Sequence, residues 1–367
     1  MKTILFKLLF LVALSPTIAF CTNGDLPDAF KGRHTREKKI TKQFNVAPDA
    51  ILKINNSYGN IDLKTWDQNR VTIEVIIKTN GNDEQKVKEK LDEINVEFNQ
   101  TSAGVSAKTN FRKENSSWLS SIFSSSNNVN MEINYIIRAP VTNNVDLSND
   151  YGHIFIDKLS GNARISCDYG RLDIGELNGN NNQINFDYSR NSRFGYINRA
   201  VINADYSEFS IDDARSIDLN ADYTTSKIKR VESLKFSCDY GSLSVDKVKV
   251  IEGSGDYLST RIGDLYQSAN LNFDYGSASI DKIMKGAGQI KINSDYTGLK
   301  IGYDPAQAFR FTVNTSYAGV KGIDDFEVNK QNQSSTSKSF SGHHLNSSGN
   351  GNIIITSSYG SVTFSRQ

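Results

Sequence analysis

The chain has 367 residues, of which 42 are basic and 41 acidic, so its formal net charge is +1. This balance excludes the global basic field expected of a nucleic-acid-binding protein, and there is no acidic tail. Gly (26) and Tyr (16) are plentiful and Pro (5) is scarce, a composition typical of many strands and tight turns.

Residues 1–19 have the pattern of an export signal peptide. Lys2 and Lys7 flank its start, the stretch from Leu8 to Leu14 is apolar, and Thr17 to Ala19 fits a small-residue cleavage site. The apolar stretch is shorter than the roughly 20 residues that a transmembrane helix needs. We therefore expect an exported protein without a transmembrane span, in the periplasm, on the outer surface or secreted.

Cys21 follows directly, and a lipid anchor on this residue is an alternative that the bulky Phe20 disfavours. Residues 20–43 are expected to form a linker. Residues 44–140 alternate between apolar and polar positions as strands do, with a helix predicted near 83–94, where Val87, Leu91 and Ile94 share one face. Within 112–130, an apolar tip around Trp118 is interpreted either as a lid on its own domain or as a partner or membrane contact.

A Tyr recurs at the end of a short strand-like run, usually as Asp-Tyr, and the steps from Tyr151 to Tyr317 are 17 to 21 residues. A fixed period of this size indicates one supersecondary unit stacked on copies of itself. The expected structural ladder comprises Tyr151, Tyr169, Tyr188, Tyr206, Tyr223, Tyr240, Tyr257, Tyr275 and Tyr296, and the wider series adds Tyr58, Tyr317 and Tyr359.

Side chains alternate faces along a strand, so positions −4 and −2 relative to each Tyr are expected to share one apolar face with it. Positions +3, +5 and +8 add further apolar points. Stacked repeats of this kind predict an all-β protein whose residues 141–330 form a parallel β-solenoid of about 17–21 residues per coil, with the rings piled along the interior. A β-sandwich is the alternative architecture. The repeat that follows Tyr188 breaks the pattern, which predicts a bulge or a local register change.

Residues 331–350 are rich in Ser and Asn and are expected to be a flexible loop in the slot of a missing repeat, where Phe340 substitutes for the Tyr. His343 and His344 are interpreted as part of this loop and not as a metal site. Residues 351–367 are expected to form the terminal coil, whose edge would be open to pairing.

Two Cys of the repeat region, Cys167 and Cys238, lie four repeats apart. At about 4.8 Å per strand they are too distant for a disulfide, so both are expected to be buried thiols.

Position −1 is Asp in nine consecutive repeats, from Asp150 to Asp295, and position −3 is often Asn. The favoured interpretation is that each Asp accepts the backbone N–H two residues on, as the first residue of a turn does. A row of Ca²⁺ sites and a flat face that binds glycans or a partner are the alternatives. The candidate binding residues are Asn185, Asp187, Asn203, Asp205, Asn220, Asp222, Asn272 and Asp274.

No catalytic residue, metal site or cofactor is predicted. The sequence lacks the GxSxG, HExxH and phosphate-binding loop motifs, and its four His do not cluster with strand ends.

The segments "NNSYGNIDLKTWDQNRVTIEV", "SCDYGRLDI", "SCDYGSLSV" and "NFDYGSASI" resemble a bacterial family of putative adhesins of unknown function, related to GIN-type adhesin head domains. The resemblance covers most of residues 44–367 and implies a β-solenoid, but it brings no catalytic or binding residues. We expect an exported, non-enzymatic, adhesin-like protein that presents its Asn/Asp/Ser face to a glycan or an envelope protein. A purely structural envelope spacer and a polysaccharide-acting enzyme are the alternatives.

Overall fold

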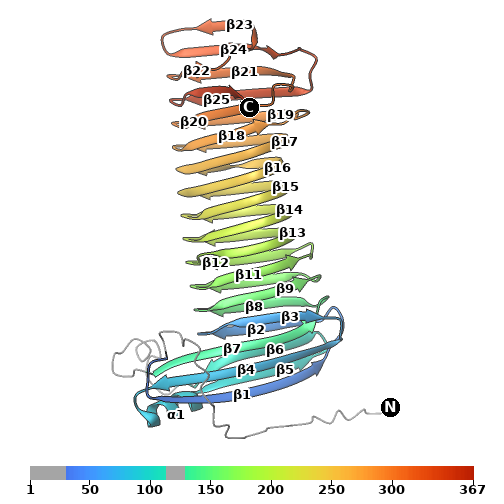
Figure 1. Ribbon diagram of the computed structural model, residues 1–367, viewed down its shortest axis with the longest axis vertical. Helices are drawn as coiled ribbons and strands as arrows, with labels where there is room; N and C mark the ends of the chain where they lie inside the picture. The colour runs from blue at the N-terminus through green and yellow to red at the C-terminus, as the bar shows by residue number, and fades with distance from the viewer. Residues whose placement is uncertain (1–29, 113–128) are drawn as a thin grey trace.

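The computed structural model describes residues 30–112 and 129–367, in which one open sheet of 26 strands is accompanied by one helix (Figure 1). The all-β prediction and the short helix are confirmed. The sheet is mixed, because strands pair antiparallel in the base and at the upper end. Within the solenoid predicted for 141–330, the upper end departs from parallel pairing, since β21 and β23 each pair antiparallel with β24. The predicted signal peptide and the apolar tip around Trp118 lie outside the described residues.

The base is formed by strands that pair largely in antiparallel fashion. Its strands are β1 (His34–Asn45), β4 (Arg70–Gly81), β5 (Ile94–Thr101), β6 (Gly104–Phe111) and β7 (Val129–Pro140). β1 pairs with β4, β4 with β7, and β5 with β6. β1 begins at His34, so the second half of the segment 20–43, predicted as a linker, belongs to a strand.

The helix α1 (Glu84–Glu93) lies where the sequence predicts it. Asp83 caps its first turn by accepting hydrogen bonds from the backbone N–H groups of Gln85 and Lys86 at 3.0 and 3.2 Å. Val87 is buried, so one face of the helix contributes to the base. No helix in 30–112 or 129–367 has the length and apolarity to cross a bilayer.

Base and repeats belong to the same sheet. β2 (Ile51–Ser57) and β3 (Ile61–Trp66), on either side of Tyr58, pair in parallel with β8 (Asn144–Asp150) and β9 (His153–Leu159), on either side of Tyr151. We call each Tyr with the strand before it and the strand after it a rung, named by its Tyr. The Tyr58 rung thus lies directly against the Tyr151 rung.

Above these, the strands pair in parallel, each in register with the corresponding strand of the next rung. They are β10 (Ala163–Asp168), β11 (Arg171–Leu177), β12 (Asn182–Asp187), β13 (Ser192–Asp205), β14 (Glu208–Asp222), β15 (Thr225–Asp239), β16 (Gly241–Asp256), β17 (Leu258–Asp274), β18 (Ser277–Ile283), β19 (Gln289–Asp295), β20 (Gly298–Tyr303) and β21 (Phe309–Ser316). Ile202 pairs with Leu219, for example, and Leu219 with Phe236. From β14 to β17 one strand runs the whole way from one Tyr to the next (Figure 1).

The core follows the apolar positions that the sequence analysis singled out. Buried side chains at position −4 include Ile165, Ile202 and Leu219, and positions +3 and +5 contribute residues such as Leu243 and Val245. Because neighbouring rungs are in register, these columns form one continuous apolar interior.

The predicted register change after Tyr188 is present. Ser166 pairs with Asn185, an offset of 19 residues, whereas Ile174 pairs with Phe194, an offset of 20. The additional residue is taken up at the corner, where Asn191 has a left-handed φ of 58°. Asn tolerates this conformation better than most residues.

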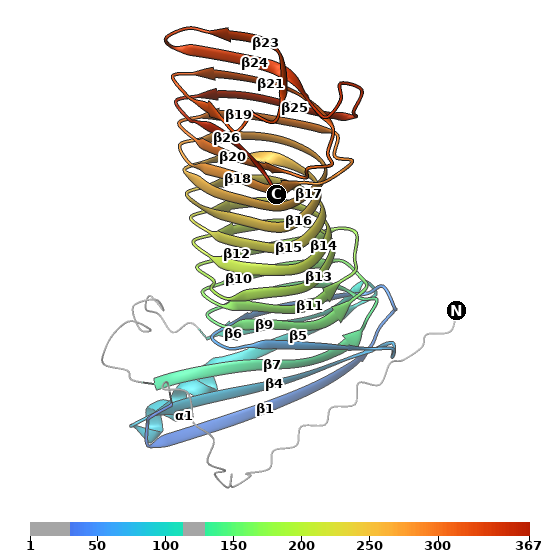
Figure 2. The same ribbon diagram turned by 45° about the horizontal axis from the view of Figure 1, so that its top comes forward.

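The upper end departs most from expectation. Its strands are β22 (Val320–Lys321), β23 (Glu327–Gln333), β24 (Ser337–His344), β25 (Gly351–Ser358) and β26 (Val362–Arg366). Much of the segment predicted as the flexible loop 331–350 is an antiparallel hairpin, with β24 also paired to β21 (Figure 2). Phe340 lies opposite Val313 in this pairing, so it does not replace a missing Tyr.

The predicted terminal coil is not at the end of the stack. β25 pairs with β19 on one side and with β21 on the other, so the Tyr359 rung lies between the Tyr296 and Tyr317 rungs. The step of 42 residues from Tyr317 to Tyr359 therefore reflects a return of the chain and not two repeats in series. The outermost strand at this end is β23, whose polar sequence EVNKQNQ suits an exposed edge.

A buried polar network joins the base to the first repeat. Asn56 Nδ2 donates to Asn149 Oδ1 at 3.1 Å and to the Ile133 carbonyl at 2.9 Å, and Thr109 Oγ1 donates to Asn56 Oδ1 at 3.1 Å. Thr109 also shares a 2.8 Å hydrogen bond with the hydroxyl of Tyr135, whose pKa burial raises to about 12. Asn149 occupies position −2, which is apolar in most repeats, so this contact is specific to the junction.

Candidate functional site

The Tyr side chains mark the corner of every rung, and they point outward. All twelve have a left-handed φ between 46° and 64°, and those from Tyr151 to Tyr359 are 46–63% exposed. The expectation that they lie on the interior face is therefore wrong. Side chains alternate between the two faces only while the strand is extended. A residue with left-handed φ interrupts this alternation, so the Tyr side chain points to solvent and the side chain of the next residue points to the interior.

The rings nonetheless stack as a ladder along the molecule. Successive centroids are 4.6–5.3 Å apart and ring planes agree within 9°, in the order 58, 151, 169, 188, 206, 223, 240, 257, 275, 296, 359 and 317. Each inner ring has both faces covered by its neighbours. The ladder therefore offers ring edges and hydroxyl groups to a ligand. At its lower end Phe111 packs edge-to-face against Tyr58, with a centroid distance of 6.2 Å.

The Asp column makes a different hydrogen bond from the one expected. Asp205 Oδ1 accepts the backbone N–H of Asp222 in the next rung at 3.1 Å, and Asp222 Oδ1 accepts that of Asp239 at 3.1 Å. The same bond recurs from Asp168 to Asp187, Asp187 to Asp205 and Asp239 to Asp256. These five carboxylates thus tie one rung to the next, and for them the interpretation as a cap within their own turn is wrong.

The N–H that such a cap would use is bonded elsewhere. The Ser189 and Ser207 N–H groups, each two residues after an Asp, donate to Ser207 Oγ and Thr224 Oγ1 at 3.1 Å. The Thr224 hydroxyl in turn donates to the carbonyls of Ala204 and Asp222 at 2.8 and 2.9 Å. This buried hydroxyl column was missed because the Tyr was assigned to the interior. Its sequence signal is the repeated Ser or Thr immediately after the Tyr.

The Asn side chains form two amide ladders. Asn203 Nδ2 donates to Asn185 Oδ1 at 2.7 Å and Asn220 Nδ2 to Asn203 Oδ1 at 3.0 Å. Higher up, Asn293 donates to Asn272 at 2.8 Å. Between the two ladders, the equivalent positions are Ser237 and Ser254, so the structure brings Asn185, Asn203 and Asn220 together and separates them from Asn272.

Four Asp residues of the column have raised pKa values, chiefly because they are partly buried. Burial raises the pKa of Asp168, Asp187 and Asp256, and the neighbouring column carboxylates raise it further; for Asp150 burial is the cause. Two ion pairs, Arg230 with Asp213 and Lys227 with Glu208, lie beyond the Tyr corner from the Asp column. The face formed by the Tyr, Asp and Asn columns is thus rich in carboxylates and other hydrogen-bonding groups.

In residues 30–112 and 129–367, no three His, Cys, Asp or Glu side chains converge in the manner of metal ligands. His343 and His344 lie on β24. His344 is buried against Tyr303 and Phe309 and its Nδ1 is 2.8 Å from the Gln307 carbonyl, while His343 is 3.3 Å from Glu327.

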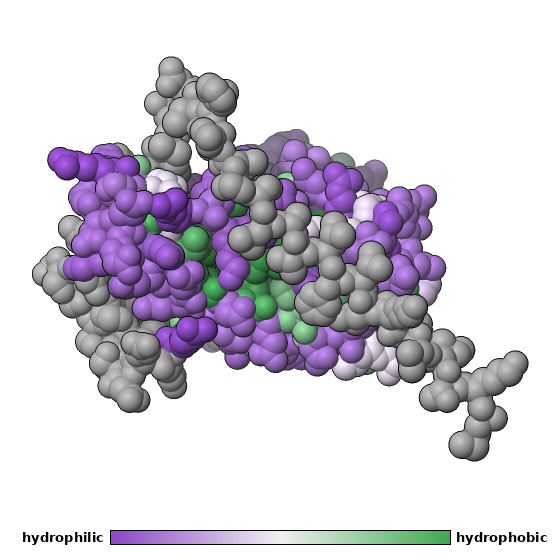
Figure 3. All heavy atoms as spheres, turned by 90° about the horizontal axis from the view of Figure 1, so that it is seen from below, coloured by the Kyte–Doolittle hydropathy of each residue, from purple (hydrophilic) through white to green (hydrophobic). Residues whose placement is uncertain are grey.

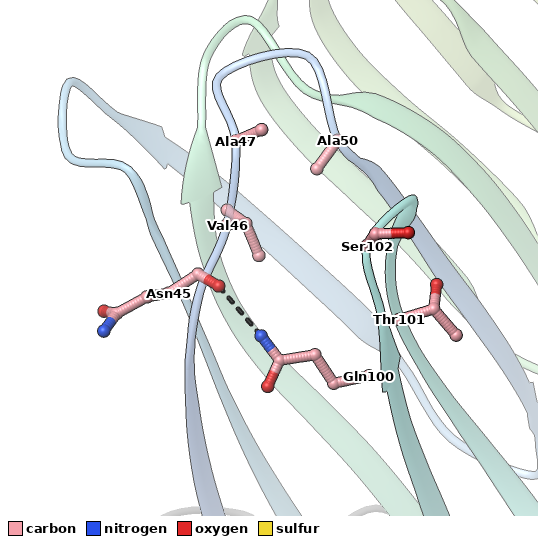
Figure 4. A pocket seen from close by; sticks show the side chains of 8 residues that line it. Asn45, Val46, Ala47, Ala50, Gln100, Thr101 and Ser102 are labelled. Carbon is pink, nitrogen blue, oxygen red and sulfur yellow. Dashed lines mark hydrogen bonds between the residues drawn. The ribbon is translucent and has the colours of Figure 1, made fainter. Parts of the chain in front are cut away.

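The hollows of the described surface are shallow. One of about 360 Å³ lies at the base, where β1 ends and β5 turns into β6, and Gln100 Nε2 donates there to the Asn45 carbonyl at 2.9 Å (Figure 4). Seen from below, apolar residues show between hydrophilic rims at this end (Figure 3). Partly buried apolar residues of the base include Ile40, Phe44 and Phe98.

Comparison with known proteins gives solved structures only, since no family model and no curated protein matches the chain. It is similar to a putative cell adhesion protein from Clostridium sporogenes, with 9% identity, coverage of 90% of this chain and 100% of that one, and a TM-score of 0.20. It is also similar to a putative adhesin from Parabacteroides distasonis, with 11% identity, coverage of 72% and 93%, and a TM-score of 0.33. A putative adhesin from Bacteroides fragilis has 12% identity, coverage of 89% and 97%, and a TM-score of 0.24.

All three of these proteins are described as putative adhesins or cell adhesion proteins, which is also the description of the family that the sequence resembles.

Proposed function

We propose that this chain is an exported, adhesin-like β-solenoid without catalytic activity, which presents its Asn/Asp/Ser face to a glycan or protein partner at the bacterial cell envelope. The parallel register from β8 to β21 supports the solenoid, and the signal-like sequence of residues 1–19 supports export.

One observation carries the proposal. Asn203, Asp205, Asn220 and Asp222 project from adjacent rungs of the sheet, and all four are exposed. Their spacing is fixed by backbone pairing and by their own hydrogen bonds, so little conformational entropy is lost when a partner binds them. A partner with regularly spaced hydrogen-bonding groups, such as a polysaccharide or an extended protein segment, fits this face best.

The test replaces Asn203, Asp205, Asn220 and Asp222 together by Ser. Binding to a glycan array and to an envelope extract should fall at least tenfold. The matched control replaces Glu208 and Asp212 by Ser, because it removes one half-buried and one exposed carboxylate from the Tyr206 rung, on the far side of its Tyr corner. Unchanged binding by a folded quadruple variant would contradict the proposal that this face binds the partner.

A structural envelope spacer is the second candidate. Side-chain bonds between rungs, such as those of the Asp column, stiffen the stack along its length and favour this role. A spacer predicts no saturable ligand. Turnover on a panel of polysaccharides would instead favour an enzyme.

A further inference from the structure

The Tyr359 rung lies between two rungs that precede it in the chain. Ile355 of β25 pairs in parallel with Ile292 of β19 and with Val313 of β21. β26 pairs in the same way with β20 and β22. The rung also fills the core here, because the side chains of Ile353, Ile355, Val362 and Phe364 are buried.

A single loop connects this rung to the hairpin above it. His344 at the end of β24 and Gly351 at the start of β25 are both partners of Phe309, on opposite sides of β21. Residues 345–350 therefore cross two strand spacings, about 10 Å. Six residues can reach about 20 Å when extended, so the loop is longer than the crossing needs.

The other rungs have no such freedom. In the middle of the stack each strand continues directly from one Tyr corner to the next, so the Tyr206 rung cannot leave without its neighbours. The Tyr359 rung, in contrast, can leave its place in the stack as a unit, because only the loop 345–350 joins it to the rest of the chain. It would leave a slot with two unpaired strand edges, one from β19 and β20 and the other from β21 and β22.

We propose that this slot is a strand-exchange site, in which the Tyr359 rung of a second copy of this chain takes the place of the chain's own rung. A second copy is the occupant that meets every requirement of the slot. It supplies two strands of the right length, apolar residues at the buried positions and a Tyr for the gap in the ladder between Tyr296 and Tyr317. Exchange restores each pairing, so the two forms differ mainly at the loop and in the entropy of association.

This inference does not depend on the proposed function. It concerns contacts between copies of the chain, whereas the Asn and Asp columns of the proposed binding face lie on lower rungs.

The test uses Asn314→Cys and Thr356→Cys in separate preparations of the full chain, both carrying Cys21→Ser. The two positions are exposed partners on β21 and β25, and the Cα separation of adjacent strands, about 4.8 Å, permits a disulfide. Cys167 and Cys238 are retained because they are buried. The preparations are mixed at high concentration under mild oxidation and analysed on a non-reducing gel.

Mixing Asn203→Cys with Asn220→Cys provides the control, because these positions are also partners on adjacent rungs that no single loop can release. We expect at least a tenfold excess of linked dimer in the 314/356 mixture, increasing with concentration. An amount equal to the control would overturn the proposal.

A second measurement uses both substitutions in one chain, oxidised while dilute so that its own rung is locked in the slot. Light scattering should then show monomers at concentrations where the reduced form dimerises. Dimers that persist after locking would also overturn the proposal, since copies would then meet through their outer surfaces. Thermal melts establish that each variant is folded.

Discussion

The ring of Tyr296 stacks on the ring of Tyr359 at a centroid distance of 4.6 Å and an interplanar angle of 3°. Tyr317, which is nearer in sequence, stacks on the far side of Tyr359 at 5.0 Å. The ladder is thus continuous in space although its order departs from the order of the chain. Whatever binds along this face meets a regular surface that two separate segments complete.

Because Tyr223 has a left-handed conformation, we expect the variant Tyr223→Gly to be more stable than Tyr223→Ala. A left-handed residue with a Cβ costs about 1–2 kcal/mol, whereas Gly adopts it freely. Tyr223→Gly loses two stacking contacts, each contributing about 0.5–1.5 kcal/mol, but removes this strain. Tyr223→Ala loses the same contacts and keeps the strain. Its free energy of unfolding in urea should therefore be about 1 kcal/mol lower than that of Tyr223→Gly.

For comparison, Ser237 lies on an extended strand, where the order should be the usual one, with Ala more stable than Gly. A Tyr223→Ala protein that is more stable than Tyr223→Gly would contradict the left-handed corner.

The repeat made much of the fold predictable. The apolar columns at −4, +3 and +5, the parallel pairing of the repeats, the helix near residue 83 and the register change after Tyr188 all follow from period and alternation. Local spacing is sufficient for these features, because each depends on residues within one or two repeats.

Two features could not be predicted in this way. The positive φ at each Tyr reverses the direction of its side chain. Residues other than Gly, Asn, Asp and His seldom adopt a positive φ, so the identity of the residue as Tyr does not predict it. The position of the Tyr359 rung depends on a return of the chain across β21, which periodicity cannot distinguish from further repeats in series. The candidate binding residues were predicted as a set, but the interruption at Ser237 and Ser254 divides their amide ladder.

The Asp column predicts a stability maximum on the acid side of neutrality. The pKa values of Asp150, Asp168, Asp187 and Asp256 are raised by folding, so the folded chain binds protons more readily than the unfolded one. The free energy of unfolding should therefore rise as the pH falls from neutral towards the ordinary aspartate pKa of 3.8. Thermal melts across this range measure the effect.

Single variants separate this effect from the ion pairs. Asp256→Asn should be more stable than the wild type at pH 7, and the gain should shrink towards pH 4. Asp213→Asn should behave oppositely, because hydrogen bonding to Arg230 lowers the pKa of Asp213 and stabilises the fold at neutral pH. Equal pH profiles for the wild type and Asp256→Asn would contradict the raised pKa of Asp256, which burial and the neighbouring carboxylates cause.

The buried amide of Asn149 should matter more than the apolar residue at the same position of the next rung. Asn149 Nδ2 donates to the Gly59 carbonyl at 2.8 Å, and its Oδ1 accepts from Asn56. Asn149→Ala removes one donor from the Gly59 carbonyl and one acceptor from Asn56, which keeps its bonds to Ile133 and Thr109, at about 1–3 kcal/mol for each buried group left unsatisfied. Cys167→Ala is the control and should cost less. Equal losses in urea unfolding would argue against the network.

The two buried thiols should be inert in the folded protein. Burial raises the pKa of Cys167 and Cys238 to about 12, so little thiolate is present at pH 8. Iodoacetamide should label them only after denaturation, which mass spectrometry of the two peptides can measure. Rapid labelling of either thiol in native protein would show that its rung opens.

The spatial order of the rungs is tested most directly by two double variants of one chain, compared for disulfide formation in dilute solution. In Asn293→Cys/Thr356→Cys the two positions are partners on adjacent strands, and an intramolecular disulfide should form readily. In Asn293→Cys/Asn314→Cys the Tyr359 rung separates them, by about 10 Å for two strand spacings, so no disulfide should form. A disulfide between positions 293 and 314, with none between 293 and 356, would contradict this order.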